Sequence, residues 1–543
     1  MVAGRLAENP DVKILVIEAG ITNPGDVDAI TTPARAFELR DSKYDWSYKT
    51  TMIDRPEYTR IEKPNTRGKT LGGSSCLNYY TWIPGSAATF DEWADFGGDE
   101  WTWKTLQPYF YKPATYHDDA GLHRPELKYI GQSGPIPVSH ADLIPEMAPF
   151  RDALTKAWVS KGEPLTDDVH NGTMRGLWKS LNSIHAGKRS SSWLYLVDKP
   201  NVTVLGHTIA SRLVFSSDST IPKATGITVL LPDNTPVTFT ARRELILSLG
   251  VFETPKLLLL SGIGPGPAGT FLPSPHVGRN LLDHPILPHV FKLRPGHGLD
   301  PTLLHAGPLR DAAVSQYRWK GTGALASGLL ELVGLPRIDE RLAKIPAYVA
   351  AKAANGGRCP FGPQGQPHFE IDFVPMFSDA FQWHIPAPEG DEGEYMTVIV
   401  DLLRPLSKSG TVDLVDEDAR TAPRVNLNFF SDALDLVAMR EGVRWVDELL
   451  MEGEGMKDVV VGDYPWRMPR AGDEAMEKMV LERSQTGFRE FFSWFLGVHV
   501  LGGSGKGLTG CRSVRKRQDG QGYRAWCGRW EAPRSRRGES EDH

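Results

Sequence analysis

The sequence is poor in cysteine and shows neither a long apolar run nor a strong excess of charge. Its 543 residues include 4 cysteines, and its formal net charge is −6 at pH 7. Four scattered cysteines predict neither a disulfide framework nor a metal cluster. The balanced charge argues against a nucleic-acid partner. The absence of any apolar stretch of about 18 residues argues against a membrane span. No secretory leader is visible at Met1, which leaves the localisation open.

Two common motifs are also missing from the glycine-rich stretch GKTLGGSS, residues 68–75. A phosphate-binding P-loop needs a glycine five residues before Gly68, where this sequence has lysine, and a nucleophile elbow needs G-x-S-x-G. What remains is either a plain structural turn or a run of small residues that lets the backbone approach a ligand. The hydrogen-bonding groups of this stretch and of the residues after it are Ser74, Ser75, Asn78 and Thr81.

The N-terminal stretch MVAGRLAENPDVKILVIEAG, residues 1–20, reads as an amphipathic piece followed by a buried strand that ends in Glu18 and a glycine. This order is typical of the second half of a dinucleotide-binding βαβ unit, in which the acid accepts hydrogen bonds from an adenosine ribose. The first strand and the G-x-G-x-x-G turn of such a unit do not precede it. The pattern therefore indicates either a nucleotide-binding unit without its phosphate loop or a coincidence.

Hydrophobic patterns predict the remaining elements. A β-meander is expected over 201–215, 224–231 and 242–249, followed by a helix that begins near Thr254 and ends at Gly262. An antiparallel sheet is expected next, over 368–377, 395–405, 410–417 and 424–430, and then a helix over 432–451. This order predicts a nucleotide-binding domain interrupted by a second domain rich in sheet.

Two stretches resemble the signatures of a known family. GKTLGGSSCLNYYTWIPGSAATFD, residues 68–91, resembles the first signature of the glucose–methanol–choline (GMC) flavoprotein oxidoreductases. GVFETPKLLLLSGIG, residues 250–264, is similar to the second, and departs from it at Val251, where the family usually has a small residue. Further stretches agree in order between about residues 2 and 504. The chain is therefore identified as a member of this family.

The resemblance implies an α/β fold (α+β overall) with a discontinuous, Rossmann-like FAD-binding domain and an inserted antiparallel-sheet substrate domain. The FAD-binding domain is expected over residues 1–130, 195–295 and 480–504, and the substrate domain over 131–194 and 296–479. Residues 505–543 are rich in lysine, arginine and glycine and poor in aliphatic side chains, so we expect a disordered tail.

The resemblance also implies which residues hold the cofactor. Glu18 would bind the adenosine ribose, the turn of Gly72, Gly73 and Ser74 would lie against the flavin or its pyrophosphate, and Ala210 would contact adenine through its backbone. Asn78 and Thr81 would form hydrogen bonds to the cofactor. Because position 78 is asparagine and not histidine, we expect FAD to be bound non-covalently, and we expect no metal.

The implied chemistry is oxidation of an alcohol (CH–OH) to an aldehyde or ketone. A hydride passes from the alcohol carbon to the flavin while a histidine takes the hydroxyl proton, and oxygen or another acceptor then reoxidises the flavin. The best match to the catalytic histidine is His499 in FSWFLGVHVLGGSG, although Gly503 and Ser504 depart from the family pattern. The alternative is a core histidine on an apolar segment. The aromatic-rich residues 373–386 indicate one of two things. They suit an aryl or polyketide-like alcohol of secondary metabolism as the substrate, or they are side chains of the hydrophobic core.

The resemblance breaks at both ends of the sequence. The phosphate turn is unmatched at the start, and the strand and second active-site residue that follow the histidine in the family are unmatched at the end. Two hypotheses follow: an FAD-dependent alcohol oxidase or dehydrogenase whose recorded ends are truncated or aberrant, or a catalytically inactive remnant that acts as a binding protein without flavin.

Overall fold

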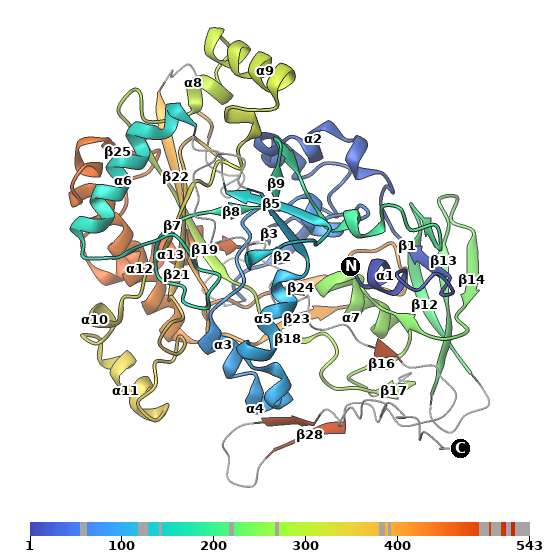
Figure 1. Ribbon diagram of the computed structural model, residues 1–543. Helices are drawn as coiled ribbons and strands as arrows, with labels where there is room; N and C mark the ends of the chain where they lie inside the picture. The colour runs from blue at the N-terminus through green and yellow to red at the C-terminus, as the bar shows by residue number, and fades with distance from the viewer. Residues whose placement is uncertain are drawn as a thin grey trace, which may run out of the picture.

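The computed structural model describes residues 1–54, 62–117, 129–140, 144–216, 222–266, 271–378, 386–388 and 393–487, together with the backbone of residues 499–500, 512–516 and 523–526. Within these residues the fold is mixed α/β, with mixed and antiparallel sheets, as the sequence predicted (Figure 1). None of the helices in this part of the chain combines the length and the apolar character that a bilayer crossing requires.

The N-terminal residues form a short helix, α1 (Val2–Leu6), and the predicted strand, β1 (Ile14–Ile17). The strand was expected to be buried, but its residues are half-buried or exposed. β1 pairs in parallel with β11 (Val202–Leu205), so that Ile14 lies opposite Val202. The side-chain amide of Asn201 donates to three carbonyl oxygens of the loop between α1 and β1, which fastens this loop to the start of β11. The parallel pair is what a nucleotide-binding unit requires at this point.

A three-stranded meander follows, formed by β12 (Ile209–Phe215), β13 (Ala224–Leu230) and β14 (Pro236–Thr240). Its third strand was predicted too late in the chain, over 242–249, because a turn at Asn234 with φ of +66° reverses the chain earlier. Of 242–249, only β15 (Leu245–Ile246) is a strand.

The next helix, α7 (Gly250–Leu260), packs its leucines against this meander. It begins at Gly250 and not near Thr254, so its predicted start was also too late. Gly250 has a φ of +90°, which allows the chain to turn directly from the strand region into the helix.

The largest sheet has eight strands, of which seven run in the order β25-β19-β22-β21-β20-β7-β6 while β26 pairs with β19. All neighbours are antiparallel except β6 and β7. The strands are β6 (Leu165–Thr166), β7 (Gly176–Lys179), β19 (Pro285–Leu293), β20 (Leu332–Leu335), β21 (Phe369–Val374), β22 (Glu394–Leu402), β25 (Val460–Tyr464) and β26 (Gln485–Thr486).

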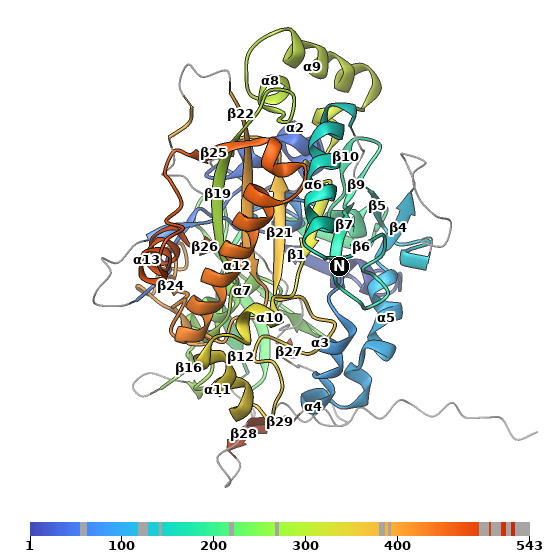
Figure 2. The ribbon, with the colours of Figure 1, turned by 90° about the vertical axis from the view of Figure 1, so that its left-hand side faces the viewer.

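Helices α6 (Ala148–Ser160) and α12 (Ala433–Glu452) lie over one face of this sheet (Figure 2). The α12 helix was predicted almost residue for residue. Its Gly442 lies against the ring of Phe369 in β21, where an added Cβ atom would be 2.4 Å from the ring. The main hydrophobic core therefore forms between α12, α6 and the strands beneath them.

A five-stranded sheet has the order β18-β23-β24-β2-β3. Its strands are β18 (Arg279–Leu281), β23 (Gly410–Asp413), β24 (Arg424–Asn426), β2 (Tyr48–Thr51) and β3 (Glu62–Asn65). The sequence placed β21 to β24 in one sheet, which is wrong, because β24 pairs in parallel with β2 and so joins the N-terminal part of the chain. The predicted division into two domains stays a prediction, and this sheet contains strands from both of its parts.

The smaller helices include an aromatic group, α3 (Ala87–Asp91), α4 (Ala94–Gly97) and α5 (Trp103–Tyr111), whose rings of Phe90, Trp103 and Phe110 pack together. Near the C-terminus the backbone of β27 (His499–Val500) pairs with β15. In the predicted disordered tail the backbones of β28 (Arg512–Lys516) and β29 (Tyr523–Trp526) pair with each other, and the rest of that tail lies outside the described residues.

Candidate functional site

The loop after β1 packs directly against the glycine-rich stretch of residues 67–76. The amide of Leu71 donates to the carbonyl oxygen of Ile21 at 2.8 Å. A Cβ atom on Gly20 would lie 1.8 Å from the carbonyl oxygen of Lys69, so only glycine fits between the two segments. This contact places the carboxyl end of β1 beside the glycine-rich loop.

Glu18 lies at the carboxyl end of β1, with its side chain half-buried. One carboxylate oxygen accepts a hydrogen bond from the Gly20 amide at 2.8 Å. Burial raises the pKa of Glu18 to about 7, although backbone hydrogen bonds from Gly20 and Ala19 and the charge of Lys69 oppose the rise. A half-buried carboxylate here is placed as a ribose-binding acid is placed in dinucleotide folds. The contact itself stays a prediction.

The turn of the glycine-rich loop leaves its backbone open at one residue. Gly72 and Gly73 have φ angles of +100° and +55°, and Gly73 begins a short 3₁₀ helix, η3 (Gly73–Cys76). A Cβ atom on Gly72 would lie 2.9 Å from Cys76 Sγ, whereas one on Gly73 would meet no atom within 4 Å. Gly73 therefore faces open space, where a ligand can approach the main chain.

Serine hydroxyls hold this loop in shape. Ser74 Oγ accepts a hydrogen bond from the Gly68 amide at 3.1 Å. Ser75 Oγ donates to the Gly72 carbonyl oxygen at 2.6 Å and accepts from the Ser192 amide at 3.0 Å. Ser74 thus closes the loop on itself, and its predicted contact with the cofactor stays a prediction.

Arg189 also belongs to this site, although no sequence motif indicated it. Its Nη1 donates to both the carbonyl oxygen and the side-chain oxygen of Asn78, at 2.8 Å each, and its Nε donates to the Ile30 carbonyl oxygen at 2.8 Å. The guanidinium lies 4.0 Å from the centre of the Tyr80 ring, and Arg189 is only 7% exposed. Asn78 is exposed, so a buried cation fixes the orientation of an amide whose nitrogen remains for a ligand. Arg189 belongs to GKRSSSWLYL, residues 187–196, one of the further stretches that resemble the family, but the resemblance assigned no role to this arginine.

Ala210 and Thr81 were also predicted to contact the cofactor. Ala210 is in β12 and belongs to the same hydrophobic cluster as Ile17 of β1. The Thr208 amide donates to the Glu18 carbonyl oxygen at 2.9 Å, which brings the start of β12 to the end of β1. Thr81 forms an isolated antiparallel bridge with Asn182. The roles of Ala210 and Thr81 in cofactor binding stay predictions.

His499, the predicted catalytic base, is described only through its backbone. That backbone pairs with Ile246 of β15 in an antiparallel register. The His499 side chain lies outside the described residues, so its predicted role is untested.

Together these groups fit an adenine dinucleotide. An acid ends a parallel strand, an open glycine backbone lies beside it, and Asn78 presents an amide held from behind by a buried arginine. The described residues thus provide acceptors for a ribose and a close backbone approach for a flat, charged cofactor.

Several known proteins and one protein family are similar to this chain. Two family profiles described as GMC oxidoreductase match residues 62–286 and 405–491. Among curated proteins, an oxygen-dependent choline dehydrogenase of Burkholderia thailandensis is 28% identical over 95% of this chain and 86% of its own length. A similar enzyme of Pseudomonas putida is also 28% identical, over 94% of this chain and 86% of its own length.

Among solved structures, the chain is similar to a formate oxidase of Aspergillus oryzae. A variant of that enzyme, described for the effect of an arginine substitution on FAD modification, superposes with a TM-score of 0.87 and 55% identity, over 90% of this chain and 85% of the other. A fungal aryl-alcohol oxidase superposes with a TM-score of 0.71 over 89% of this chain and 86% of the other, but its 22% identity supports the fold alone.

Proposed function

Because the chain belongs to the GMC oxidoreductase family and is by that membership an FAD-dependent oxidoreductase, we propose that it oxidises formate with oxygen as the electron acceptor. The balanced reaction is HCOO⁻ + O₂ + H⁺ → CO₂ + H₂O₂. The single observation that carries this proposal is the 55% identity to a formate oxidase over 90% of the chain. The two choline dehydrogenases named above are each 28% identical.

Bound FAD supplies a two-electron acceptor for the hydride of the substrate carbon. We propose that Glu18 accepts hydrogen bonds from the ribose, and that the open backbone at Gly73 lies against the flavin or its pyrophosphate. Asn78, held by Arg189, donates to the cofactor through its amide nitrogen. The raised pKa of Glu18, about 7, fits a carboxyl that is incompletely solvated until such donors are present.

Formate and an alcohol place different demands on the protein. An alcohol must lose its hydroxyl proton to a base as the hydride leaves, which is the role predicted for His499. Formate at neutral pH is already ionised and has no hydroxyl proton to lose. A formate-oxidising site needs instead a group that orients a small anion.

Oxidation of an alcohol is the second candidate, favoured by the choline dehydrogenases that match 95% of the chain. For this reaction we keep His499 as the base, so that His499→Ala lowers alcohol turnover by about 10²–10⁴-fold. A role in secondary metabolism was inferred from residues 373–386, part of which lies outside the described residues, and it stays a prediction.

The test uses the full chain, purified with its flavin content measured by absorbance after denaturation. Oxygen consumption is followed with formate, choline and benzyl alcohol as substrates, and formate is compared with deuterated formate. Turnover of formate with a primary isotope effect supports the proposal. Turnover of an alcohol without formate turnover overturns it in favour of the second candidate, and protein that binds no added FAD favours the inactive-remnant hypothesis.

A further inference from the structure

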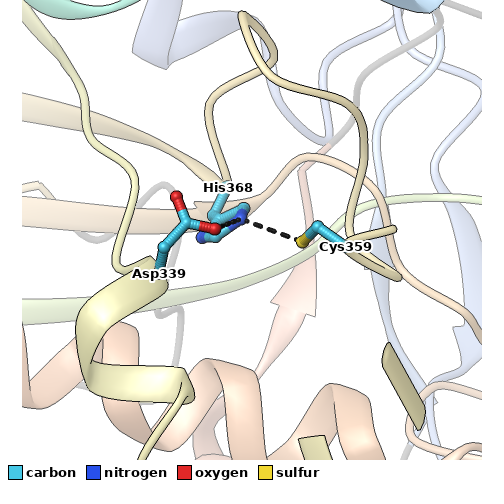
Figure 3. Close-up of side chains that lie close together, drawn as sticks. All are labelled: Asp339, Cys359 and His368. Atoms are coloured by element: carbon cyan, nitrogen blue, oxygen red, sulfur yellow. Dashed lines mark hydrogen bonds and ion pairs between the residues drawn. The ribbon is translucent and has the colours of Figure 1, made fainter. Parts of the chain in front are cut away.

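Asp339, Cys359 and His368 converge at a place that the proposed function does not use. Asp339 begins α10 (Asp339–Leu342), Cys359 lies between α11 (Pro346–Ala354) and β21, and His368 directly precedes β21. Figure 3 shows the three side chains pointing toward one another. His368 Nε2 lies 3.4 Å from Cys359 Sγ and 3.6 Å from Asp339 Oδ1. A carboxylate, a thiol and an imidazole this close resemble a site for a transition metal.

The hydrogen bonds of His368 argue against a metal. Its Nδ1 accepts from the Ile338 amide at 3.2 Å, so this nitrogen carries no proton. Burial and the charge of Arg337 lower the pKa of His368 to about 3, so the ring is neutral at pH 7 and its one proton is on Nε2. A metal needs the lone pair of Nε2, which that proton occupies. Nε2–H is instead a donor facing the sulfur of Cys359.

The Asp339 carboxylate is also already bound. Arg337 Nε and Nη2 donate to its two oxygens at 2.7 and 2.9 Å, a two-pronged pairing that neutralises the carboxylate. The Arg337 guanidinium interacts with the Cys359 thiol as well. The cation that this carboxylate requires is therefore provided by the protein itself.

A third donor faces the same sulfur. Tyr348 is 1% exposed, and its hydroxyl has no hydrogen-bond partner within the described residues. The neighbour of this hydroxyl is the Cys359 thiol. Buried hydroxyls nearly always have an acceptor. The sulfur, a weak acceptor, is thus shared by donors from His368, Arg337 and Tyr348, and the Tyr348 hydroxyl has no stronger acceptor within hydrogen-bonding geometry among the described residues.

We propose that Cys359 is a peroxide-reactive thiol whose sulfenic acid is held by the Tyr348 hydroxyl and His368 Nε2–H. Cys359 is not fully enclosed by the protein, and hydrogen peroxide is small enough to approach a half-buried residue. In the reaction Cys–SH + H₂O₂ → Cys–SOH + H₂O, an S–O bond forms and the O–O bond breaks. The sulfur loses two electrons, the peroxide is reduced to water, and the thiol proton leaves in that water. The new oxygen is a stronger acceptor for the Tyr348 hydroxyl than the sulfur is.

The sulfenic acid persists because no second thiol described in the structure lies beside it. Cys76, the other described cysteine, is fully buried in a separate cluster with Ile30, Leu39 and Leu77. Condensation to a disulfide with Cys76 is therefore blocked by distance and burial. The proposal does not depend on the substrate of the enzyme, because added hydrogen peroxide serves as the oxidant.

The experiment treats the full chain with hydrogen peroxide, traps sulfenic acid with dimedone and maps the adducts by peptide mass. We expect Cys359 to be labelled about tenfold faster than Cys76, with no label at this position in Cys359→Ser. In Tyr348→Phe, dimedone added after a delay should capture about threefold less Cys359 adduct, because the sulfenic acid loses a donor. Circular dichroism checks that this variant is folded.

Two results would overturn the proposal, and the first can be read from the unmodified protein. The first is labelling of Cys359 no faster than that of Cys76. The second is stoichiometric binding of Zn²⁺ that disappears in Cys359→Ser and protects Cys359 from peroxide, which would show that the three side chains form a metal site. If dimedone added after a delay captures as much Cys359 adduct in Tyr348→Phe as in the wild type, the Tyr348 hydroxyl does not hold the sulfenic acid.

Discussion

One nitrogen of Arg189, Nη1, binds both the main-chain and the side-chain oxygen of Asn78. The arginine is buried and the asparagine is exposed, so the pair connects the interior to the face on which we place the cofactor. A single buried cation thereby sets both the path of the backbone at Asn78 and the direction of its amide.

Replacing this cation is expected to destabilise the protein. Arg189→Met removes the donor to the buried Ile30 oxygen and to the partly buried oxygens of Ser75 and Asn78, which should lower the free energy of unfolding by about 2–4 kcal/mol. Urea unfolding measures the change. The matched control is Arg279→Met, which breaks a surface pair with Asp413 and should cost less than about 1 kcal/mol. Equal losses in the two variants would contradict the prediction.

Replacing Gly73 is expected to weaken FAD binding, beyond the small loss of stability that alanine causes at a left-handed position. Gly73→Ala forces alanine into a left-handed conformation at a cost of about 1–2 kcal/mol, and puts a methyl group into the space that faces the ligand. We expect FAD affinity to fall at least about tenfold, a loss of about 1.4 kcal/mol. Gly356→Ala is the control, because Gly356 has a φ of +66° and equally open space around it. The two variants should lose similar stability, and only Gly73→Ala should lose flavin binding by fluorescence titration.

Glu18 is expected to make stability and FAD binding depend on pH in opposite ways. Its folded-state pKa of about 7 lies above its ordinary value of 4.5, so the folded protein without FAD holds this proton more tightly than the unfolded chain. Stability should therefore fall as the pH rises from about 4.5 to about 7, by at most about 3 kcal/mol. Ribose hydroxyls donate to the ionised carboxylate, so FAD affinity should rise over the same range and level off above pH 7.

Unfolding and FAD titrations at pH 5, 6, 7 and 8 measure both slopes of the Glu18 prediction. Glu18→Gln should flatten both. Glu8→Gln, at an exposed ion pair with Arg5, should leave them as they are. A wild-type slope that survives in Glu18→Gln would show that another group titrates.

Asp463 is expected to give stability the opposite dependence on pH. Burial alone would raise the pKa of Asp463, but hydrogen bonds from His289 and Arg470 more than offset burial and hold this pKa well below 3.8. The stabilisation is therefore complete above about pH 4 and is lost as the pH falls further. Asp463→Asn should lower the free energy of unfolding by about 2–4 kcal/mol at pH 7 and lose less between pH 5 and pH 3 than the wild type. Asp95→Asn, at an exposed residue of α4, should behave as the wild type does in the same urea titrations.

Local patterns in the sequence were enough to predict the elements whose residues interact with near neighbours. The strand that ends at Glu18 and the helix α12 follow from hydrophobic period, and the open turn at Gly73 follows from a run of small residues. The start of α7 was misplaced because Thr254 followed by Pro255 is a common pattern at the start of a helix, whereas α7 begins at Gly250 and contains Pro255.

Partners that are far apart in the chain left no local signal. Nothing near Asn78 indicates that residue 189 will supply its cation, and nothing in β24 indicates that it will pair with β2 and not remain with β22. The side chains of Asp339, Cys359 and His368 come from three separate segments, so no spacing rule groups them. In each case the grouping depends on the path of the chain, which short-range residue patterns do not specify.

The parallel pairing of β1 with β11 has a consequence for how the protein is made. Ile14 leaves the ribosome long before its partner Val202 exists, so the strand emerges with its hydrogen-bonding edge unsatisfied. Pairing between segments so distant must first overcome the entropy of closing a long loop, which slows folding. The nascent chain should therefore bind chaperones during this interval. The residues that we place around the cofactor, Glu18, Gly73 and Asn78, should reach their final arrangement only after β12 has been translated.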